Sequence, residues 1–469
     1  MKMQSIHRFL WIGSKFTSLN SSLLSSFFLH TRRWISSKIY QELTNKSLFC
    51  SHFPDKVDVD EFLSRKQTIY AGFDATNQSL HVGNLLVLIS LFHLAHHGHK
   101  IIVLIGDCTA KIGDPSGKLI ERSVIDDETI ELNAKGIEND VRQVWQNYLQ
   151  SFARHRIDDR NLMICRNSDW YSKMNVIEFI GKYARQMRMG DLLSKSSIKE
   201  RLESPIGLNF SEFSYQCFQA YDWYHLRKRF NCNIQIGGTD QMINIHNGYD
   251  LIKKIDEKFV CGLFVPLITD AKGNKLGKTD QKAYYLNSNL TTPFGLYQYC
   301  MRIVDSQINK IFKMFSFRSL SDIENIIQEQ MRNPKPWRLQ RYLAEELVQF
   351  VHGPIGLERA KAITKALFDK NLDTIGNLDL KSIRDIFDDV SEISIEFVQD
   401  QLTLLNLTMR CGFFVDEMQA IKTIKDGGIY LNYQRMTDPG QLIESNQILN
   451  NGISIISFGK RNYRIIRWL

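Results

Sequence analysis

Two short stretches of the sequence carry side chains that could act together on a phosphate. One contains His81 and Asn84 in the run His-Val-Gly-Asn, and the other contains Lys275, Lys278 and Thr279 in the run Lys-Leu-Gly-Lys-Thr. Lysine ammonium groups neutralise phosphate charge, and histidine and asparagine side chains can donate hydrogen bonds to phosphate oxygens. Displacement at phosphorus depends on positioning and charge neutralisation more than on acid or base groups. A lysine-rich turn alone is usually a solvated surface, but the two stretches together predict a triphosphate site.

The first stretch lies inside a predicted β-α-β unit. Residues 68–73 are β-branched and aromatic and indicate a buried strand, residues 85–95 indicate an apolar helix, and residues 101–106 indicate the next strand. Such units build buried parallel sheets, whose ligands bind at the carboxyl ends of the strands. His81 and Asn84 fall at that edge, beside a helix N-terminus that attracts anions.

A polar stripe on a second helix points to another part of a ligand. The segment 211–224 has helical character, and Tyr215, Gln219 and Asp222 are spaced so that they project from one face. Aromatic residues flank this stripe, which indicates a buried helix rather than a solvated face. Buried polar groups need hydrogen-bond partners, and a bound polar ligand would supply them.

The rest of the chain supports an α/β fold followed by two smaller parts. Further segments of the first part are a helix at 128–152, strands at 162–165, 233–236 and 263–269, and a turn at 237–241. Beyond Pro293 the sequence is helical and lacks buried strands. Residues 373–396 are acidic and irregular and indicate a linker, and residues 397–469 combine helical segments with terminal strands.

Composition limits the class of protein. The chain has 469 residues, enough for two or three domains, and its hydrophobic content of 43% is that of a globular protein. A formal charge of +8 suits a partner such as RNA without proving one. The eight cysteines are scattered without metal-ligand spacing. A histidine cluster at the end of the first helix could hold a metal, but cations at a helix C-terminus are the commoner cause, so the sequence predicts no metal site: His93, His96, His97 and His99.

The first 40 residues have the composition of a mitochondrial transit peptide. They are rich in serine, contain Lys and Arg, and have no acidic residue before Glu42. A secretory signal is the alternative, through the apolar run 23–29, but serines interrupt that run and no small-residue cleavage site follows it. No stretch reaches the length of a membrane span. We expect a mitochondrial matrix protein.

Several motifs in order resemble one family of enzymes. From about Ile69 to the C-terminus, the chain is similar to class I aminoacyl-tRNA synthetases, and within them to the mitochondrial and bacterial-type tyrosyl-tRNA synthetases. The motifs are YAGFDAT, LHVGN, IGDPSGK, FSYQCFQAYD, IGGTDQ and KLGKT. The resemblance implies a doubly wound parallel sheet of Rossmann type in 41–289, with an insertion near 150–230 at a homodimer interface. It also implies an α-helical anticodon-recognition domain in 290–372 and a small α+β RNA-binding domain in 397–469.

The resemblance also implies a reaction and the residues that carry it. Tyrosine and ATP would give tyrosyl-adenylate and pyrophosphate, with magnesium accompanying ATP, and the tyrosyl group would pass to tRNA(Tyr). The implied tyrosine-binding residues are Tyr70 and Asp222 at the phenol, Asp114, Tyr215 and Gln219 at the ammonium, and Gln241 near the carboxylate. The implied ATP-binding residues are Gly72, Asp74, His81, Gly83, Asn84, Gly238, Asp240, Lys275 and Lys278. The implied catalytic residues are His81, Asn84, Lys118, Arg122, Lys275, Lys278 and Thr279.

The sequence departs from the family motifs at two positions. Asn84 stands where the usual motif has a second histidine, and Met242 follows Gln241 where many relatives have tryptophan.

A tryptophanyl-tRNA synthetase of the same fold is one alternative function, and the polar stripe of Tyr215, Gln219 and Asp222 argues against it. A catalytically idle RNA-binding protein, such as a splicing factor, is the other. Basic residues of a terminal hairpin are either tRNA contacts or an ordinary surface strand: Lys460, Arg461 and Arg464.

Overall fold

The computed structural model describes residues 38–116, 121–153, 157–267, 283–368, 371–386, 392–398, 401–459 and 462–469. The chain forms two compact units. One consists of Met1–Ala283 and Asn309–Asn333, and the other of Tyr284–Ile308 and Pro334–Leu469. None of the described helices has the length and apolar character required to cross a membrane.

A six-stranded sheet forms the centre of the first unit. The strands follow the spatial order β1-β6-β5-β2-β3-β4. All neighbours pair in parallel except β1, which pairs antiparallel with β6. The predicted doubly wound sheet is therefore confirmed. Its strands are β1 (Ser51–Phe53), β2 (Thr68–Asp74), β3 (Lys100–Gly106), β4 (Leu162–Arg166), β5 (Cys232–Gly238) and β6 (Cys261–Val265).

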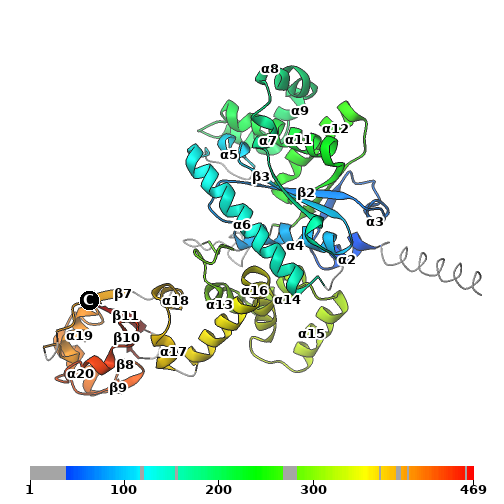
Figure 1. The fold of residues 1–469 in the computed structure, drawn as a ribbon. Coiled ribbons are helices and arrows are strands. Elements are labelled where there is room, and N and C mark those ends of the chain that lie inside the picture. Colours follow the sequence, from blue (N-terminus) through cyan, green and yellow to red (C-terminus); the bar gives the residue numbers. More distant parts are fainter. Residues whose placement is uncertain are drawn as a thin grey trace, which may run out of the picture. The chain divides into compact units, whose positions relative to one another are not determined.

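Helices cover both faces of this sheet because its central strands are apolar on both sides. Residues 101–106 of β3 are all buried. Helix α4 (Val82–His96) packs on β2, β3 and β5, and Figure 1 shows it on the opposite side of the sheet from α11 (Phe210–Phe230) and α12 (Met242–Asp256). Helix α6 (Asp127–Ser151) packs against α4 through aromatic contacts. Because side chains alternate along a strand, Tyr70 of β2 points into the core shared with Trp223 of α11.

Shorter elements complete the first unit. They include α2 (Ile39–Asn45), α3 (Val59–Leu63), α5 (Thr109–Ile112), α7 (Ser168–Tyr171), α8 (Val176–Glu178), α9 (Met189–Leu193), α10 (Ser196–Glu203) and α15 (Leu320–Arg332). Helix α14 (Asp305–Phe315) contains residues of both units. Single turns lie at Asp159–Asn161, Phe179–Tyr183, Ala184–Gln186 and Thr239–Gln241.

The second unit combines helices with a small sheet. Its helical part contains α13 (Pro293–Met301), α16 (Arg338–Phe368), α17 (Leu372–Gly376) and α18 (Leu380–Ile386). Its sheet has the order β7-β11-β10-β8-β9, with β7 parallel to β11 and the other pairs antiparallel. The strands are β7 (Glu392–Ile395), β8 (Ile429–Leu431), β9 (Gln434–Met436), β10 (Ile453–Phe458) and β11 (Asn462–Trp468).

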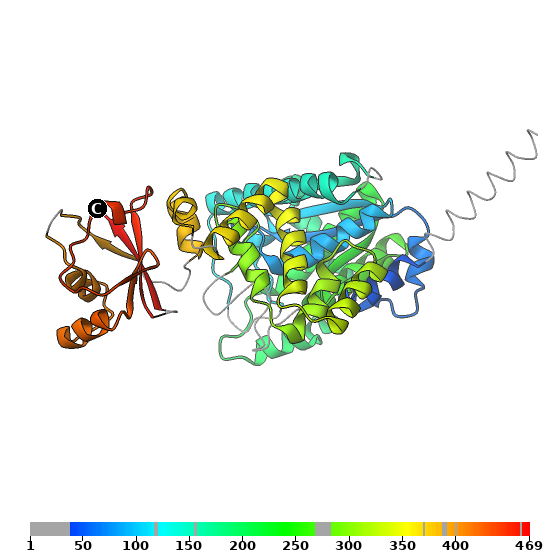
Figure 2. The ribbon, with the colours of Figure 1, turned by 90° about the horizontal axis from the view of Figure 1, so that it is seen from below.

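Two short helices, α19 (Leu404–Arg410) and α20 (Glu417–Lys425), lie beside the strands of the small sheet (Figure 2). Leu407 and Ile424 from these helices share a buried core with Ile456 and Ile466 from the sheet. An α+β fold was predicted for this part of the chain. The interval 373–396, expected to be a linker, instead includes most of α17, all of α18 and strand β7.

Candidate active site

A cavity of about 370 Å³ lies at the carboxyl ends of β2, β3 and β5. Parallel sheets place their ligands at this edge, and the helices α4 and α5 begin there. The cavity is lined by every described residue that was predicted to bind tyrosine or ATP or to take part in catalysis. These are Tyr70, Gly72, Asp74, His81, Gly83, Asn84, Asp114, Arg122, Tyr215, Gln219, Asp222, Gly238, Asp240 and Gln241.

Six predicted residues lie outside the described residues. Four of them were expected to act on the phosphates, and two were expected to contact tRNA. They are Lys118, Lys275, Lys278, Thr279, Lys460 and Arg461. The third tRNA candidate, Arg464, is half-buried on β11, where its guanidinium lies over the ring of Phe413.

One end of the cavity presents a buried phenol and a buried carboxylate. The hydroxyl of Tyr70 has no hydrogen-bond partner among the described residues, although the side chain is only 1% exposed. Asp222 accepts hydrogen bonds from Trp170 Nε1 at 2.9 Å and from Asn167 Nδ2 at 3.2 Å. Burial raises the pKa of Asp222 to about 7 in spite of these bonds. A ligand hydroxyl placed here could donate to Asp222 and accept from Tyr70.

A second carboxylate, Asp74, ends strand β2 in the middle of the cavity. Its two oxygens accept hydrogen bonds from Thr109 Oγ1 at 2.7 Å and from the hydroxyl of Tyr215 at 2.8 Å. Burial raises the pKa of Asp74 to about 6, and the nearby charge of Asp114 adds to the shift. Asp74 and Asp114 together give this part of the cavity negative charge, which suits a ligand ammonium group.

Asp114 joins the loop after β3 to the turn after β5. One of its oxygens accepts from Gln241 Nε2 at 2.7 Å, and the other from the N–H of Ser116 at 3.0 Å. Asn244 Nδ2 donates to Gln241 Oε1 at 3.1 Å. Asp114, which was predicted to bind the ammonium group, and Gln241, which was predicted to lie near the carboxylate, are therefore hydrogen-bonded to each other.

His81 and Asn84 lie at the N-terminus of α4. The side-chain oxygen of Asn84 accepts from the N–H of His81 at 3.1 Å. Because the amide oxygen is used in this way, its NH₂ group is the part of Asn84 that can bind a ligand. That group donates hydrogen bonds, as a histidine N–H would, next to the positive end of the helix dipole.

Sequence reasoning missed several residues of the site. Gln235 lines the cavity, and its Oε1 atom is buried without a partner among the described residues. The signal was a polar residue inside an apolar strand, at the position that pairs with Tyr70. Asn167 and Trp170 position Asp222 from beyond the end of β4, and no local pattern marks them. In the described part of the chain, no three or more His, Cys, Asp or Glu side chains are arranged to hold a metal ion.

The chain is similar to known proteins of one enzyme family. Residues 63–369 match the family model of class I tRNA synthetases for tryptophan and tyrosine, and residues 382–466 match the model of the tyrosine–tRNA ligase SYY-like C-terminal domain. The mitochondrial tyrosine–tRNA ligase of Drosophila melanogaster is 39% identical over 94% of this chain and 96% of its own length. The human mitochondrial tyrosine–tRNA ligase is 37% identical over 90% of each chain.

Solved structures show the same similarity. A C-terminally truncated mitochondrial tyrosyl-tRNA synthetase of Aspergillus nidulans superposes with a TM-score of 0.65 and is 25% identical, covering 72% of this chain and 98% of that protein. The corresponding truncated protein of Coccidioides posadasii gives a TM-score of 0.63 at 27% identity, covering 73% of this chain and 98% of that protein.

Proposed function

The chain belongs to the tryptophan and tyrosine group of class I tRNA synthetases, and we propose that its cavity selects tyrosine and joins it to AMP. The protein is a tyrosine–tRNA ligase that uses ATP. In the first step, a carboxylate oxygen of tyrosine attacks the α-phosphorus of ATP. The new bond is an oxygen–phosphorus bond, and the bond to the bridging oxygen breaks as pyrophosphate leaves. In the second step, a hydroxyl at the 3′ end of tRNA(Tyr) attacks the tyrosyl carbonyl and AMP leaves.

The observation that carries the choice of tyrosine is the unpartnered hydroxyl of Tyr70 beside the carboxylate of Asp222. A tyrosine phenol can donate to Asp222 and accept from Tyr70 at once. The indole of tryptophan has one N–H donor and no acceptor, so it would leave the hydroxyl hydrogen of Tyr70 without an acceptor. Asp74, Asp114, Tyr215 and Gln219 then receive the ammonium group, and Gln241 lies near the tyrosine carboxylate.

A further group of residues is proposed to act on the phosphates of ATP. His81, Asn84 and Arg122 all line the cavity, and His81 and Asn84 do so at the N-terminus of α4. We assign to them, and to Lys118, Lys275, Lys278 and Thr279, the stabilisation of charge on the α-phosphate and the departing pyrophosphate. The remaining ATP contacts are assigned to Gly72, Asp74, Gly83, Gly238 and Asp240. Magnesium enters as the complex with ATP, so it is part of the substrate.

A homodimer is proposed from the apolar surface of the insertion. Around α8 and between α10 and α11, five large apolar side chains are exposed to solvent: Val176, Ile177, Ile180, Ile206 and Phe210. Exposed apolar residues that gather on one segment are typical of protein interfaces. A second copy of this chain, bound through the insertion, would cover them.

The relatives are named as mitochondrial enzymes, which supports a mitochondrial location for this chain. We propose residues 1–40 as a transit peptide and the matrix as the compartment. The helical part of the second unit is proposed to read the anticodon. The small sheet domain is proposed to contact tRNA, and Lys460, Arg461 and Arg464 are proposed as contact residues.

Aminoacylation of a tRNA(Tyr) transcript, with tyrosine and tryptophan compared as substrates, tests the function. We expect charging with tyrosine only. Equal charging with tryptophan would contradict the assignment of Tyr70 and Asp222, and binding of the transcript without charging would favour the idle RNA-binding rival.

A further inference from the structure

We propose that the buried ion pair between Arg201 and Glu212 is a positioning device that holds Arg122 in the cavity. This inference rests on the proposed function, in which the guanidinium of Arg122 meets the phosphates of ATP. It adds two residues that contact neither substrate and that lie on the insertion and at the start of α11.

The pair is fully enclosed. Arg201 Nη2 lies 2.7 Å from Glu212 Oε2, and each side chain is only 2% exposed. Removing two charges from water is costly, and replacing a buried ion pair by apolar side chains of similar volume is often neutral or stabilising. A contribution to stability therefore explains this buried ion pair poorly. The position that the pair gives to the Glu212 carboxylate explains it better.

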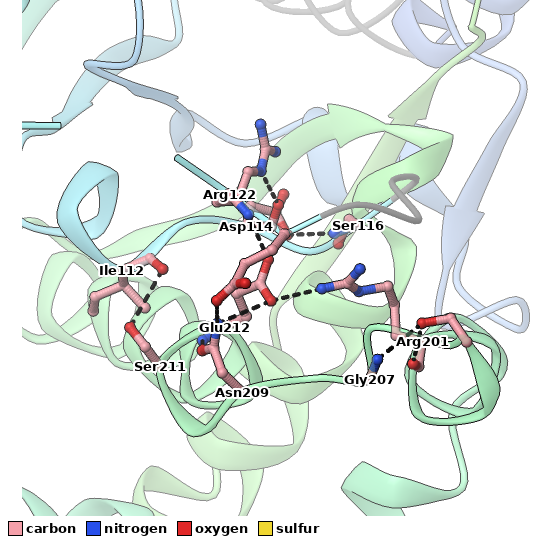
Figure 3. A network of polar contacts seen from close by, with 11 residues as sticks. Ile112, Asp114, Ser116, Arg122, Arg201, Gly207, Asn209, Ser211 and Glu212 are labelled. Atoms are coloured by element: carbon pink, nitrogen blue, oxygen red, sulfur yellow. Dashed lines mark hydrogen bonds and ion pairs between the residues drawn. The ribbon is translucent and has the colours of Figure 1, made fainter. Parts of the chain in front are cut away.

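Glu212 ties three segments of the chain together, as Figure 3 shows. Through Oε2 it binds Arg201 on α10, and through Oε1 it accepts the main-chain N–H of Arg122 at 3.1 Å. It is also the third residue of α11, whose N-terminus is capped by Asn209 Oδ1 at 2.9 Å. The carboxylate thus fixes the backbone of Arg122 relative to the helix that carries Tyr215.

Two further contacts restrain the side chain of Arg122. Its Nε atom donates to the carbonyl oxygen of Asp114 at 2.7 Å. Its Cβ and Cγ atoms pass so close to Gly113 that a Cβ on that glycine would lie 2.8 Å from each, and Gly113 has a φ of +87°. Backbone, stem and Nε are all fixed, so the terminal nitrogens of Arg122 are presented in a defined direction.

The arrangement predicts how a single atom change would act. Arg201 and the N–H of Arg122 donate to different oxygens of Glu212, and a glutamine at position 212 has an acceptor at only one of these two positions. The charged Arg201 takes that oxygen, because bonds to charged groups are the stronger ones. The amide NH₂ then faces the N–H of Arg122, and this contact is lost.

The test is single-turnover activation of tyrosine by Glu212→Gln, Arg122→Ala and the double variant, with equilibrium tyrosine binding measured alongside. We expect Glu212→Gln to slow activation at least about tenfold, since small displacements of positioned groups have effects of this size, with unchanged tyrosine affinity. The double variant should be no slower than Arg122→Ala alone, because Glu212 acts through Arg122. The matched control is Asp256→Asn, which removes the ion pair with Lys228 at the other end of α11 and should leave activation unchanged.

A rescue variant keeps the test informative if Glu212→Gln folds poorly. In Glu212→Gln combined with Arg201→Met, both buried charges are gone and the glutamine oxygen is free to accept from Arg122, so activation should recover toward the wild-type rate. A wild-type rate for Arg122→Ala would refute the role of Arg122 itself. If Arg122→Ala is slow, a normal activation rate in folded Glu212→Gln would overturn the inference, as would additive losses of rate in the double variant. A loss of tyrosine affinity that accompanies the loss of rate in Glu212→Gln, or an activation rate that does not recover in the variant with Arg201→Met, would also overturn it.

Discussion

Tyr70 is a side chain whose hydrogen bonding is incomplete until a ligand arrives. Its hydroxyl is buried at the floor of the cavity and has no partner among the described residues. An unmet buried polar group costs about 1–3 kcal/mol, so a ligand that completes the bond recovers part of that cost. Phenylalanine would not recover it, and we therefore propose this position as a source of selectivity.

Substituting Tyr70 by phenylalanine should therefore narrow the preference for tyrosine over phenylalanine. One neutral hydrogen bond contributes about 0.5–1.5 kcal/mol, so the ratio of the two kcat/KM values should fall by roughly tenfold. Steady-state pyrophosphate exchange with each amino acid measures the ratio. An unchanged ratio would remove Tyr70 from the phenol-binding pair.

Asp222 illustrates a conflict between binding and stability. Burial raises its pKa to about 7 from an ordinary value of 3.8, so between these values the folded protein binds a proton that the unfolded chain does not. The contribution of Asp222 to the free energy of unfolding is therefore largest below about pH 4 and is lost as the pH rises to about 7. Above that pH the free protein holds a buried charge that awaits its ligand.

Asp222→Asn should remove this pH-dependent cost. The free energy of unfolding of the variant, relative to wild type, should increase from pH 4 to pH 7 by up to about 4 kcal/mol and then level off. Urea unfolding at several pH values without ligand measures the difference, and tyrosine activation should be impaired throughout. A difference that stays constant with pH would mean that Asp222 is ionised in the folded protein at all these pH values.

At the scale of elements, the insertion between β4 and β5 both supports the cavity and exposes apolar surface. Trp170 at its start binds Asp222, Arg201 binds Glu212, and α11 at its end carries the polar stripe. Exposed side chains such as Ile177, which is 74% exposed, lie in the same segment. The interface of a dimer formed through this surface would therefore include elements that also position residues of the cavity.

Ile177→Glu should weaken that dimer, because a charge buried at an apolar interface is costly. Sedimentation at several protein concentrations should show dissociation at higher concentration than for wild type. The matched control is Val415→Glu on the small sheet domain, where the side chain is fully exposed and no dimer contact is proposed. A wild-type protein that is monomeric at all concentrations, or equal behaviour of both variants, would contradict the proposed interface.

The elements of this fold that could be predicted are those whose own residues indicate a strand or a helix. The strands 68–73 and 101–106 follow from runs of apolar, β-branched and aromatic residues, and the stripe on 211–224 follows from helical spacing; all three lie where they were expected. Asn167 could not be predicted, because its bond to Asp222 joins residues that are distant in sequence. The interval 373–396 appeared irregular because its helices are short, and Ile375 and Ile383 gain their burial from distant strand residues such as Ile455.

At the scale of the whole molecule, the cavity and the small sheet domain belong to different units of the chain. The cavity residues described for activation belong to the first unit, whereas the small sheet domain belongs to the second. Deleting residues 371–469 removes that sheet together with α17 and α18, which share its core. A cut at 397 would instead strip β7 of the strand that it pairs with.

This deletion should leave tyrosine activation nearly intact and weaken tRNA binding. Phosphate contacts release counterions, so the truncated protein should also bind tRNA with a weaker dependence on salt. Filter binding across a salt series, with activation measured on the same preparation, tests both points. Full charging of tRNA by a folded truncated protein would show that the small sheet domain is not the tRNA-binding surface.

Exchange of labelled pyrophosphate into ATP shows whether the cavity activates tyrosine. The assay needs no tRNA, so it isolates the first chemical step. We predict exchange that requires tyrosine and that neither tryptophan nor phenylalanine supports at comparable concentration. A folded protein that binds tRNA but shows no tyrosine-dependent exchange, or one that exchanges with tryptophan, would show that the cavity does not select and activate tyrosine.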